Sequence, residues 1–246
     1  MSEIRINKFL SEAGVCSRRE ADRMIGQGRV TVNGKVAVTG ERITADDCVC
    51  VDKKVVQRNQ KPVLIAFHKP KGIVCTTSKK ERNNIIDYIQ YPERIYPVGR
   101  LDKDSQGLIL LTNQGDLGNK IMRAANMHEK EYEVTVDRPV TPAFLRGMAG
   151  GVPLEELQVV TRPCQLRQIG KYSFRIILTQ GYNRQIRRMC EYFGYRVTRL
   201  NRIRIMNIRL DGLKEGTYRE LTPEEWSTLQ RLAAYSSADT VKGKEN

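Results

Sequence analysis

Apolar and polar positions at the start of the chain predict a small unit of two helices and a short sheet. Five apolar residues recur at helical spacing and mark one short helix: Ile4, Ile6, Phe9, Leu10 and Ala13. A second helix is expected to begin at a capping box that starts with Ser17 and to end at Gly26. After it, Asn33 and Gly34 supply the positive φ of a tight hairpin turn, and residues 49–51 add a third strand.

The pattern changes from residue 63 onward, where longer strands are mixed with helices. Apolar runs predict strands at three places: 63–67, 73–76 and 108–112. Alternation adds strands around Tyr132 and over 172–178, while Thr141 and Pro142 begin a helix. Helices inserted irregularly between strands favour an α+β fold with a mixed, mainly antiparallel sheet over a doubly wound parallel one.

These patterns divide the chain into two folded parts. Residues 1–51 form the first domain, and residues 52–62 are a polar linker without periodicity. Residues 63–232 form the second domain. Residues 233–246 contain few apolar side chains and are expected to be a disordered tail.

The charge balance of the chain indicates a class of binding partner. The 246 residues carry 42 Lys and Arg against 28 Asp and Glu, a net charge of +14, which favours a polyanionic partner such as nucleic acid. Half of that excess lies in residues 184–209, with eight arginines and only Glu191 against them. A solvated helix face is the simpler interpretation. Arginine without lysine instead favours bidentate contact to phosphate or to a buried carboxylate.

Several classes of protein are disfavoured by composition. No apolar run approaches the roughly 18 residues of a membrane span, and the first residues are too polar for a signal segment. The six cysteines lack paired ligand spacing, and His68 and His128 are the only histidines, so neither a metal site nor a disulfide scaffold is expected. The reducing cytoplasm is the expected compartment.

The loop 99–107 is the first candidate for chemistry. It places Asp102 and Asp104 directly before a buried strand, and loops held by rigid strands commonly carry function. In isolation each candidate has a structural alternative, because Asp102 could cap a turn, His68 could end a strand and Tyr132 could belong to the core.

Four segments taken together resemble the signatures of the pseudouridine synthases. They occur in this order: HKPKG (68–72), GRLDKDSQGLILLT (99–112), HEKEYEV (128–134) and GYNRQIRRMC (181–190). Two earlier segments, RINKFLSEAGVCSRREADRMI and GRVTVNGK, resemble an alpha-L RNA-binding domain. The resemblance covers about residues 3–228. It is closest to the branch of the family that modifies ribosomal RNA, and within it to a large-subunit enzyme, through LDKDSQGLILLTN and RIRIMNIRL.

The resemblance implies a small alpha-L RNA-binding domain followed by a catalytic domain, and it assigns roles to residues. The catalytic set is Asp102, Tyr132 and Arg187. Candidates for binding the target nucleotide are Arg100, Leu200, Arg184, Arg188 and Lys69. Candidates for contacting the rest of the RNA are Arg5, Lys8, Arg18, Arg19, Arg23, Arg199 and Arg202.

The reaction explains why these residue types are needed. Isomerising uridine breaks the bond from N1 to C1′ and joins C5 to C1′, and it needs neither a metal nor an organic cofactor. Asp102 would attack C1′ or remove a proton from C2′, and the resemblance leaves both open. Arg187 would offset the desolvation of that carboxylate. Tyr132 would stack on the base and present its hydroxyl near C5. The target nucleotide must first leave its stack.

Two other interpretations stay open at this point. The chain could be a catalytically silent RNA-binding factor for ribosome assembly, although such a protein would have no need of Asp102, Tyr132 and Arg187 together. It could also be the same enzyme acting on tRNA or on small-subunit ribosomal RNA. In each case we expect a monomer with an RNA partner and no membrane attachment.

Overall fold

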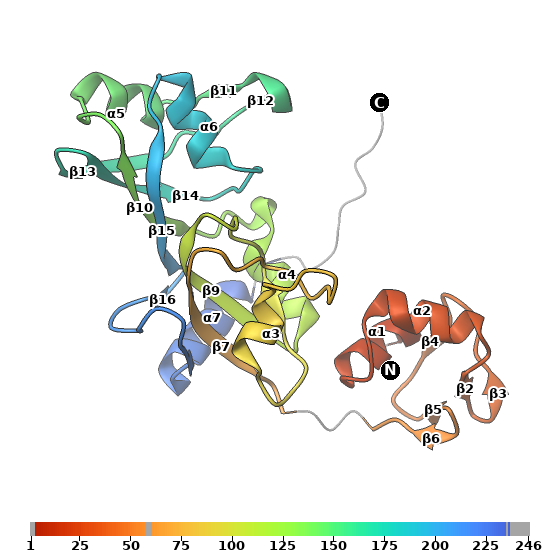
Figure 1. The fold of residues 1–246 in the computed structure, drawn as a ribbon. Helices are drawn as coiled ribbons and strands as arrows, with labels where there is room; N and C mark the ends of the chain where they lie inside the picture. Colours follow the sequence, from red (N-terminus) through yellow and green to blue (C-terminus); the bar gives the residue numbers. More distant parts are fainter. Residues whose placement is uncertain (1–2, 58–60, 235, 237–246) are drawn as a thin grey trace. The chain divides into compact units, whose positions relative to one another are not determined.

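The computed structural model describes residues 3–57, 61–234 and 236, which belong to two compact units (Figure 1). The first unit comprises Met1–Pro62 and Pro92–Arg94, and the second comprises Val63–Tyr91 and Ile95–Asn246. Most of the predicted tail, 233–246, lies outside the described residues. Ala233 is the buried last residue of a helix, so the second unit extends beyond the predicted boundary at residue 232.

The first unit packs two helices on short strands. Its elements are β1 (Ile4–Arg5), α1 (Ile6–Glu12), α2 (Arg18–Gly26), β2 (Val30–Val32), β3 (Lys35–Val36), β4 (Arg42–Ile43), β5 (Val49–Val51) and β6 (Lys54–Val55). The Ser17 hydroxyl accepts a hydrogen bond from the Glu20 amide at 3.2 Å, as the capping pattern predicts. Asn33 and Gly34 have φ of 51° and 82°, so the predicted hairpin turn is confirmed.

Two predicted boundaries in this unit are wrong. Ile4 does not belong to the first helix, because it lies in β1 and pairs with Ile43 of β4. Lys54 and Val55 fall inside the predicted linker but form β6, which pairs with β5. Positive φ at Asp52 and at Lys53 provides the tight turn between those strands, which a polar sequence without periodicity did not reveal.

The second unit is built on one mixed sheet, in the order β13-β14-β10-β15-β9-β7-β17. Its strands are β7 (Leu64–Lys69), β8 (Tyr96–Val98), β9 (Gln106–Thr112), β10 (Lys130–Val136), β13 (Gln165–Gly170), β14 (Ser173–Leu178), β15 (Val197–Ile205), β16 (Ile208–Arg209) and β17 (Tyr218–Glu220). A separate small pair is formed by β11 (Pro153–Leu154) and β12 (Val159–Val160). In the main sheet β9 and β15 run parallel, while the other described pairings are antiparallel.

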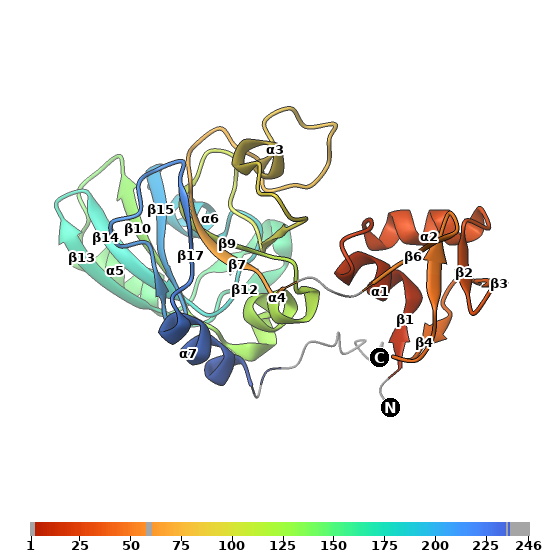
Figure 2. The ribbon, with the colours of Figure 1, turned by 90° about the horizontal axis from the view of Figure 1, so that it is seen from below.

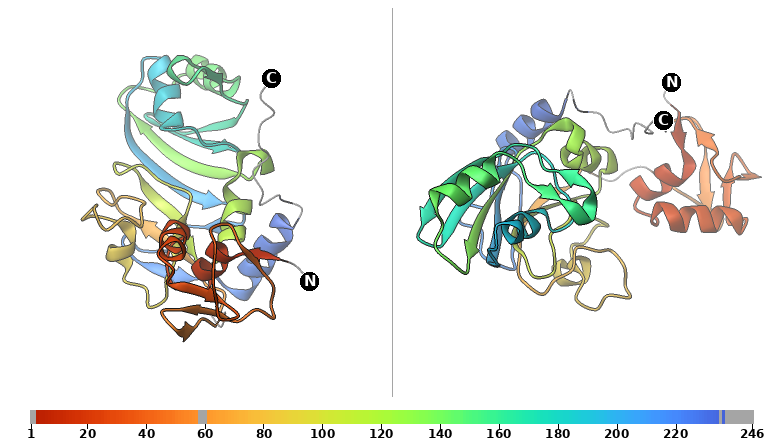
Figure 3. Two further views of the ribbon diagram at one scale, coloured as in Figure 1. Left: turned by 90° about the vertical axis from the view of Figure 1, so that its right-hand side faces the viewer. Right: turned by 90° about the horizontal axis from the view of Figure 1, so that it is seen from above.

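Helices cover both faces of this sheet. They are α3 (Ile85–Ile89), α4 (Gly115–Met122), α5 (Pro142–Ala149), α6 (Gln185–Tyr192) and α7 (Pro223–Ala233), with 3-10 turns η1 (Ala124–Asn126) and η2 (Glu155–Leu157). Ile65 and Phe67 of β7 pack with α3, whereas Leu64 and Ala66 pack with α7. This alternation places α3 and α7 on opposite sides of the sheet (Figure 2). Near its other end, α5 and α6 lie side by side (Figure 3), where Phe144 contacts Phe193 with ring centroids 5.9 Å apart.

One predicted strand is absent from the second unit as described. Residues 73–76 form no strand and contribute one isolated bridge, between Val74 and Asn84. The Val74 amide donates to the Asn83 carbonyl, and the Ile85 amide donates to the Val74 carbonyl. These bonds satisfy the backbone at Val74 locally, so an apolar run that looked like a sheet strand instead supports the start of α3.

Each unit should fold without the other. The buried residues around α1 and α2 form one cluster, and the two clusters of the second unit consist of its own residues. A chain that begins at Lys61 should therefore give the circular dichroism of a folded α+β protein and a cooperative thermal transition, and it should bind structured RNA more weakly than the full chain. An unfolded product, or RNA affinity equal to that of the full chain, would contradict two independent modules.

Candidate active site

A cavity of about 430 Å³ opens where the loop before β9 meets β10, β15 and α6. Its lining brings together segments far apart in the sequence, including Arg100, Asp102, Tyr132, Arg184 and Leu200. With Arg202, which also lines it, the structure therefore places six of the predicted site residues around one space.

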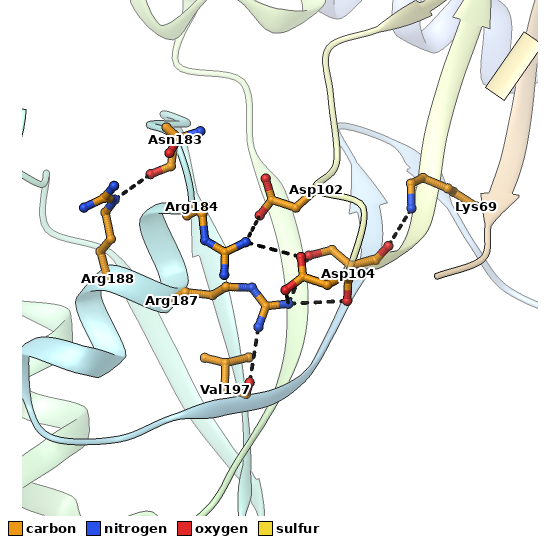
Figure 4. Close-up of polar contacts among 9 residues, drawn as sticks. Lys69, Asp102, Asp104, Asn183, Arg184, Arg187, Arg188 and Val197 are labelled. Atoms are coloured by element: carbon orange, nitrogen blue, oxygen red, sulfur yellow. Dashed lines mark hydrogen bonds and ion pairs between the residues drawn. The ribbon is translucent and has the colours of Figure 1, made fainter. Parts of the chain in front are cut away.

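Asp102 lies on the loop between β8 and β9, and its side chain is 29% exposed. One of its carboxylate oxygens lies 3.9 Å from Nη1 of Arg184 (Figure 4). Arg184 precedes α6 in the left-handed conformation, with φ of 51°, which directs the chain into the helix beside the loop. The cation next to Asp102 is thus Arg184.

Arg187 is buried and pairs with Asp104, not with Asp102 as the sequence predicted. Nη2 of Arg187 lies 3.1 Å from Asp104 Oδ2 and also donates to the Asp104 carbonyl and the Ser105 hydroxyl. Nη1 donates to the Val197 carbonyl at 3.2 Å. One guanidinium therefore joins α6, the start of β15 and the loop that carries Asp102 (Figure 4). Arg187 is therefore not part of a solvated helix face.

Tyr132 and Leu200 belong to the apolar part of the cavity lining and come from neighbouring strands. Tyr132 is nearly buried on β10, and Leu200 of β15 pairs with Val134, two residues further along β10. The guanidinium of Arg202 lies 6.0 Å from the centre of the Tyr132 ring. An aromatic ring and a leucine thus form a surface for a planar ring, with a carboxylate at the opening.

Known proteins are similar to this chain in sequence. The family model described as RNA pseudouridylate synthase matches residues 63–192, and the S4 domain model matches residues 4–47. The chain belongs to the RNA pseudouridine synthase family. Such enzymes are isomerases, and the predicted enzyme class is confirmed.

Individual relatives support the same family. The synthase is 54% identical over 237 residues to the dual-specificity RNA pseudouridine synthase RluF of Salmonella typhi, covering 96% of this chain and 81% of that protein. It is 37% identical over 236 residues to the ribosomal large subunit pseudouridine synthase B of Bacillus subtilis, covering 93% and 96%. A crystal structure of a pseudouridylate synthase aligns with a TM-score of 0.67 at 29% identity, covering 93% and 99%. The predicted α+β fold and amino-terminal RNA-binding domain are confirmed.

Arg202 does not contact solvent as an RNA-binding residue would. The sequence predicted a phosphate contact, but the side chain is 1% exposed and its Nε donates to the Leu108 carbonyl at 2.7 Å. The prediction is wrong because the side chain is buried, where its Nε bonds to a carbonyl of β9 and the guanidinium lies over the ring of Tyr132. Its Nη2 is also buried and has no hydrogen-bond partner among the described residues. In the synthase Arg202 supports the wall of the cavity.

Lys69 is also not available to substrate. Its side chain is fully buried, and Nζ donates to the carbonyls of Pro70 and Ser105 at 2.8 and 2.7 Å. Burial lowers the pKa of this ammonium group, and the negative charges of Asp102 and Asp104 act in the opposite direction. Lys69 therefore supports the loop that carries Asp102, and its prediction as a substrate-binding residue is wrong.

The remaining predicted cations differ in their partners. Arg188 lies outside the cavity lining and pairs with Glu156, whereas Arg100 is exposed beside the cavity and Arg199 is exposed on β15. In the first unit Arg5, Arg18 and Arg19 are exposed, while Lys8 pairs with Glu12 and Arg23 pairs with Glu20.

Several polar residues of the cavity were missed from the sequence. Lys130 and Gln180 are two that line it and are almost fully buried. A signal existed for Lys130, because it lies two positions before Tyr132 on an alternating strand and so faces the same side. Gln180 lies two residues after the end of β14, and no local pattern in the sequence distinguishes it.

Among the described residues, no group of three or more His, Cys, Asp and Glu side chains could hold a metal ion. Within the same residues, no helix has both the length and the apolar character needed to cross a membrane.

Replacing Lys130 with methionine should stabilise the synthase in a pH-dependent way. Burial, and then the charge of Arg202, lower the pKa of Lys130 to about 8. Below that pH the folded protein carries a buried charge, which costs on the order of 3 kcal/mol. Between pH 8 and about 10.5 the unfolded chain binds more protons, so wild-type stability rises and the advantage of the variant should disappear.

Urea unfolding of both proteins from pH 7 to 10.5 measures this difference. Lys214→Met changes an exposed lysine of the same unit and should show no such pH dependence. A difference between wild type and Lys130→Met that is constant with pH would contradict a buried charge at Lys130.

Proposed function

We propose that this synthase isomerises a uridine of large-subunit ribosomal RNA, with Asp102 as the catalytic carboxylate. The relative in Bacillus subtilis is named as a large-subunit enzyme, and the family isomerises uridine in RNA. The proposal rests above all on one observation. Asp102 keeps a partly exposed carboxylate in the lining of a cavity whose apolar residues include Tyr132 and Leu200.

In the proposed reaction a flipped uridine enters this cavity and its base stacks on Tyr132. The Asp102 carboxylate then attacks C1′ and displaces N1, or removes the C2′ proton so that N1 leaves C1′. The uracil turns and C5 bonds to C1′, which releases the carboxylate from C1′ or is followed by return of the proton to C2′. Arg184 orients the carboxylate. The Tyr132 hydroxyl takes the C5 proton as it gives up its own proton, which passes to N1. The tyrosine is thus unchanged, and the reaction is an isomerisation without net change.

The other cations are proposed to act on the rest of the RNA. Arg100 contacts the target nucleotide beside the cavity, and Arg187 positions the catalytic loop through Asp104. Arg199 and the exposed arginines of the first unit bind phosphates of the surrounding RNA. The synthase is proposed to work as a monomer in the cytoplasm.

A second RNA substrate is favoured by one observation. The relative of Salmonella typhi is named a dual-specificity enzyme. We propose tRNA as the second class of substrate for this chain.

Mapping pseudouridines in total RNA from cells with and without the gene tests both proposals. We expect one site in large-subunit ribosomal RNA, and a second in tRNA, to be lost without the gene and restored by the wild-type gene. Loss of a site in small-subunit RNA alone would contradict the proposed substrate. Unchanged RNA would favour a silent assembly factor.

A further inference from the structure

A second cavity, of about 740 Å³, lies beside the first. The two share Arg100, Leu101, Asp102 and Arg184, so the catalytic loop and one arginine separate them. The HKPKG segment contributes Lys71 to this second cavity, although its other lysine is buried. The function proposed above uses Asp102, Asp104, Arg100 and Arg184 from this cavity, and it uses neither Lys71 nor Lys103.

Three cations around the second cavity lack a partner among the residues that the structure describes. Lys71, Arg100 and Lys103 are exposed, and their side chains make no hydrogen bond or ion pair there. The two carboxylates nearby are already paired, since Asp102 contacts Arg184 and Asp104 contacts Arg184 and Arg187. The cavity therefore has an excess of positive charge directed at solvent.

Many other cations of this unit do have carboxylate partners. Arg175 pairs with Glu133, Arg204 with Glu129 and Glu131, and Arg219 with Glu225. Lys71, Arg100 and Lys103 have no such partner among the described residues, and an anionic ligand would supply the missing charge.

The two lysines are carried on segments that are joined to each other. The Gly72 amide, next to Lys71, donates to the carbonyl of Lys103 at 2.7 Å. Gly72 has φ of 89°, and no atom lies within 4 Å of where its Cβ would be, so the turn stays open toward the cavity. The cations are consequently presented by a backbone already in place before any ligand binds.

Apolar side chains also line this cavity, which suits a ligand larger than an inorganic ion. Val74 and Leu101 lie on its wall beside the cations. A ribose with its phosphodiester combines an apolar edge with a negative charge. Because the two cavities share a wall, an RNA chain whose target nucleotide occupies the first cavity must pass close to the second.

We infer that the second cavity binds the phosphodiester of the nucleotide next to the target uridine, through Lys71 and Lys103. This inference rests on the proposed function, in which the target nucleotide is flipped toward Asp102. Holding the neighbouring phosphate fixes the strand at the point where it leaves its stack and offsets part of the cost of flipping.

The test pairs two variants with a change in the RNA. The probe is a short RNA that contains the uridine identified by pseudouridine mapping, in whichever RNA that uridine lies. Lys71→Ala and Lys103→Ala should each weaken binding roughly threefold to tenfold. Each should also reduce the slope of the logarithm of the binding constant against the logarithm of the salt concentration by about 0.7. A neutral methylphosphonate at one phosphate next to the target should remove this difference, so that variants and wild type bind the modified RNA equally.

Lys79→Ala provides the matched control. Lys79 is exposed and lies, like Lys71, between β7 and α3, but it lines neither cavity. Any effect of Lys79→Ala on affinity should therefore be the same for the modified and the unmodified RNA. The inference is overturned if the affinity losses from Lys71→Ala and from the methylphosphonate add, whichever phosphate is replaced. It is also overturned if the two lysine variants bind the unmodified RNA as tightly as wild type. Because binding is measured without turnover, this result is independent of whether Asp102 is the catalytic carboxylate.

Discussion

Replacing Asp102 with asparagine should abolish isomerisation while RNA binding is retained. Asparagine keeps the size of the side chain, but it can neither attack C1′ as an anion nor take the C2′ proton. The contact to Arg184 is 3.9 Å long and partly exposed, so little stability should be lost. We expect the single-turnover rate at saturating RNA to fall by at least about 10³-fold, with an unchanged Kd.

Asp104→Asn is the matched control, because the two carboxylates share one loop and both contact Arg184. Asp104 also pairs with the buried Arg187, so its replacement should lower the unfolding midpoint and reduce the rate only in part. If Asp102→Asn turned over near the wild-type rate and Asp104→Asn did not, the catalytic assignment would move to Asp104.

Replacing Gly107 with alanine should unfold the second unit or destabilise it by more than about 4 kcal/mol. Gly107 has φ of 114°, and an added Cβ would lie 2.4 Å from both the backbone nitrogen and the backbone oxygen of Arg202. These atoms belong to β15, which pairs with β9 at this residue, so neither strand can move away without losing the pairing.

Urea unfolding measures the effect, with Gly118→Ala as the control. An added Cβ at Gly118 would meet Val98 at 3.5 Å, an ordinary contact, and the helical position favours alanine. Its stability should stay within about 1 kcal/mol of wild type. A Gly107→Ala protein with the wild-type midpoint would show that the β9–β15 pairing tolerates a side chain.

Features with a local chemical cause were predictable from the sequence. Asn33 and Gly34 specify their turn by backbone conformation, and Thr141 caps α5 through its own hydroxyl. The alternation around Tyr132 identified the buried face of β10, and Lys130 could have been added by the same period. The family resemblance of the four segments predicted that Asp102 and Tyr132 belong to one site, and both line the same cavity.

Charge partners were not predictable, because tertiary structure supplies them. A solvated helix face was one interpretation of the arginines that include Arg187, but the loop at Asp104 and Ser105 covers this side chain. Lys69 and Arg202 were expected at the surface, since buried cations are rare without partners, and backbone carbonyls of distant residues provide those partners. No local pattern indicates which carbonyl will lie nearby.

The parallel pairing of β9 with β15 has a consequence for the order of folding. Asn201 pairs with Gln106, about 95 residues earlier, while β13 and β14 are joined by a short connection. Bringing β9 and β15 together closes a long stretch of chain, and this costs conformational entropy before the pairing of the two strands is stabilised. The cavity takes its walls from both sides of this pairing, so a refolding chain should recover its secondary structure first and its catalytic competence last. The synthase leaving the ribosome thus becomes active only after β15 has been made and docked.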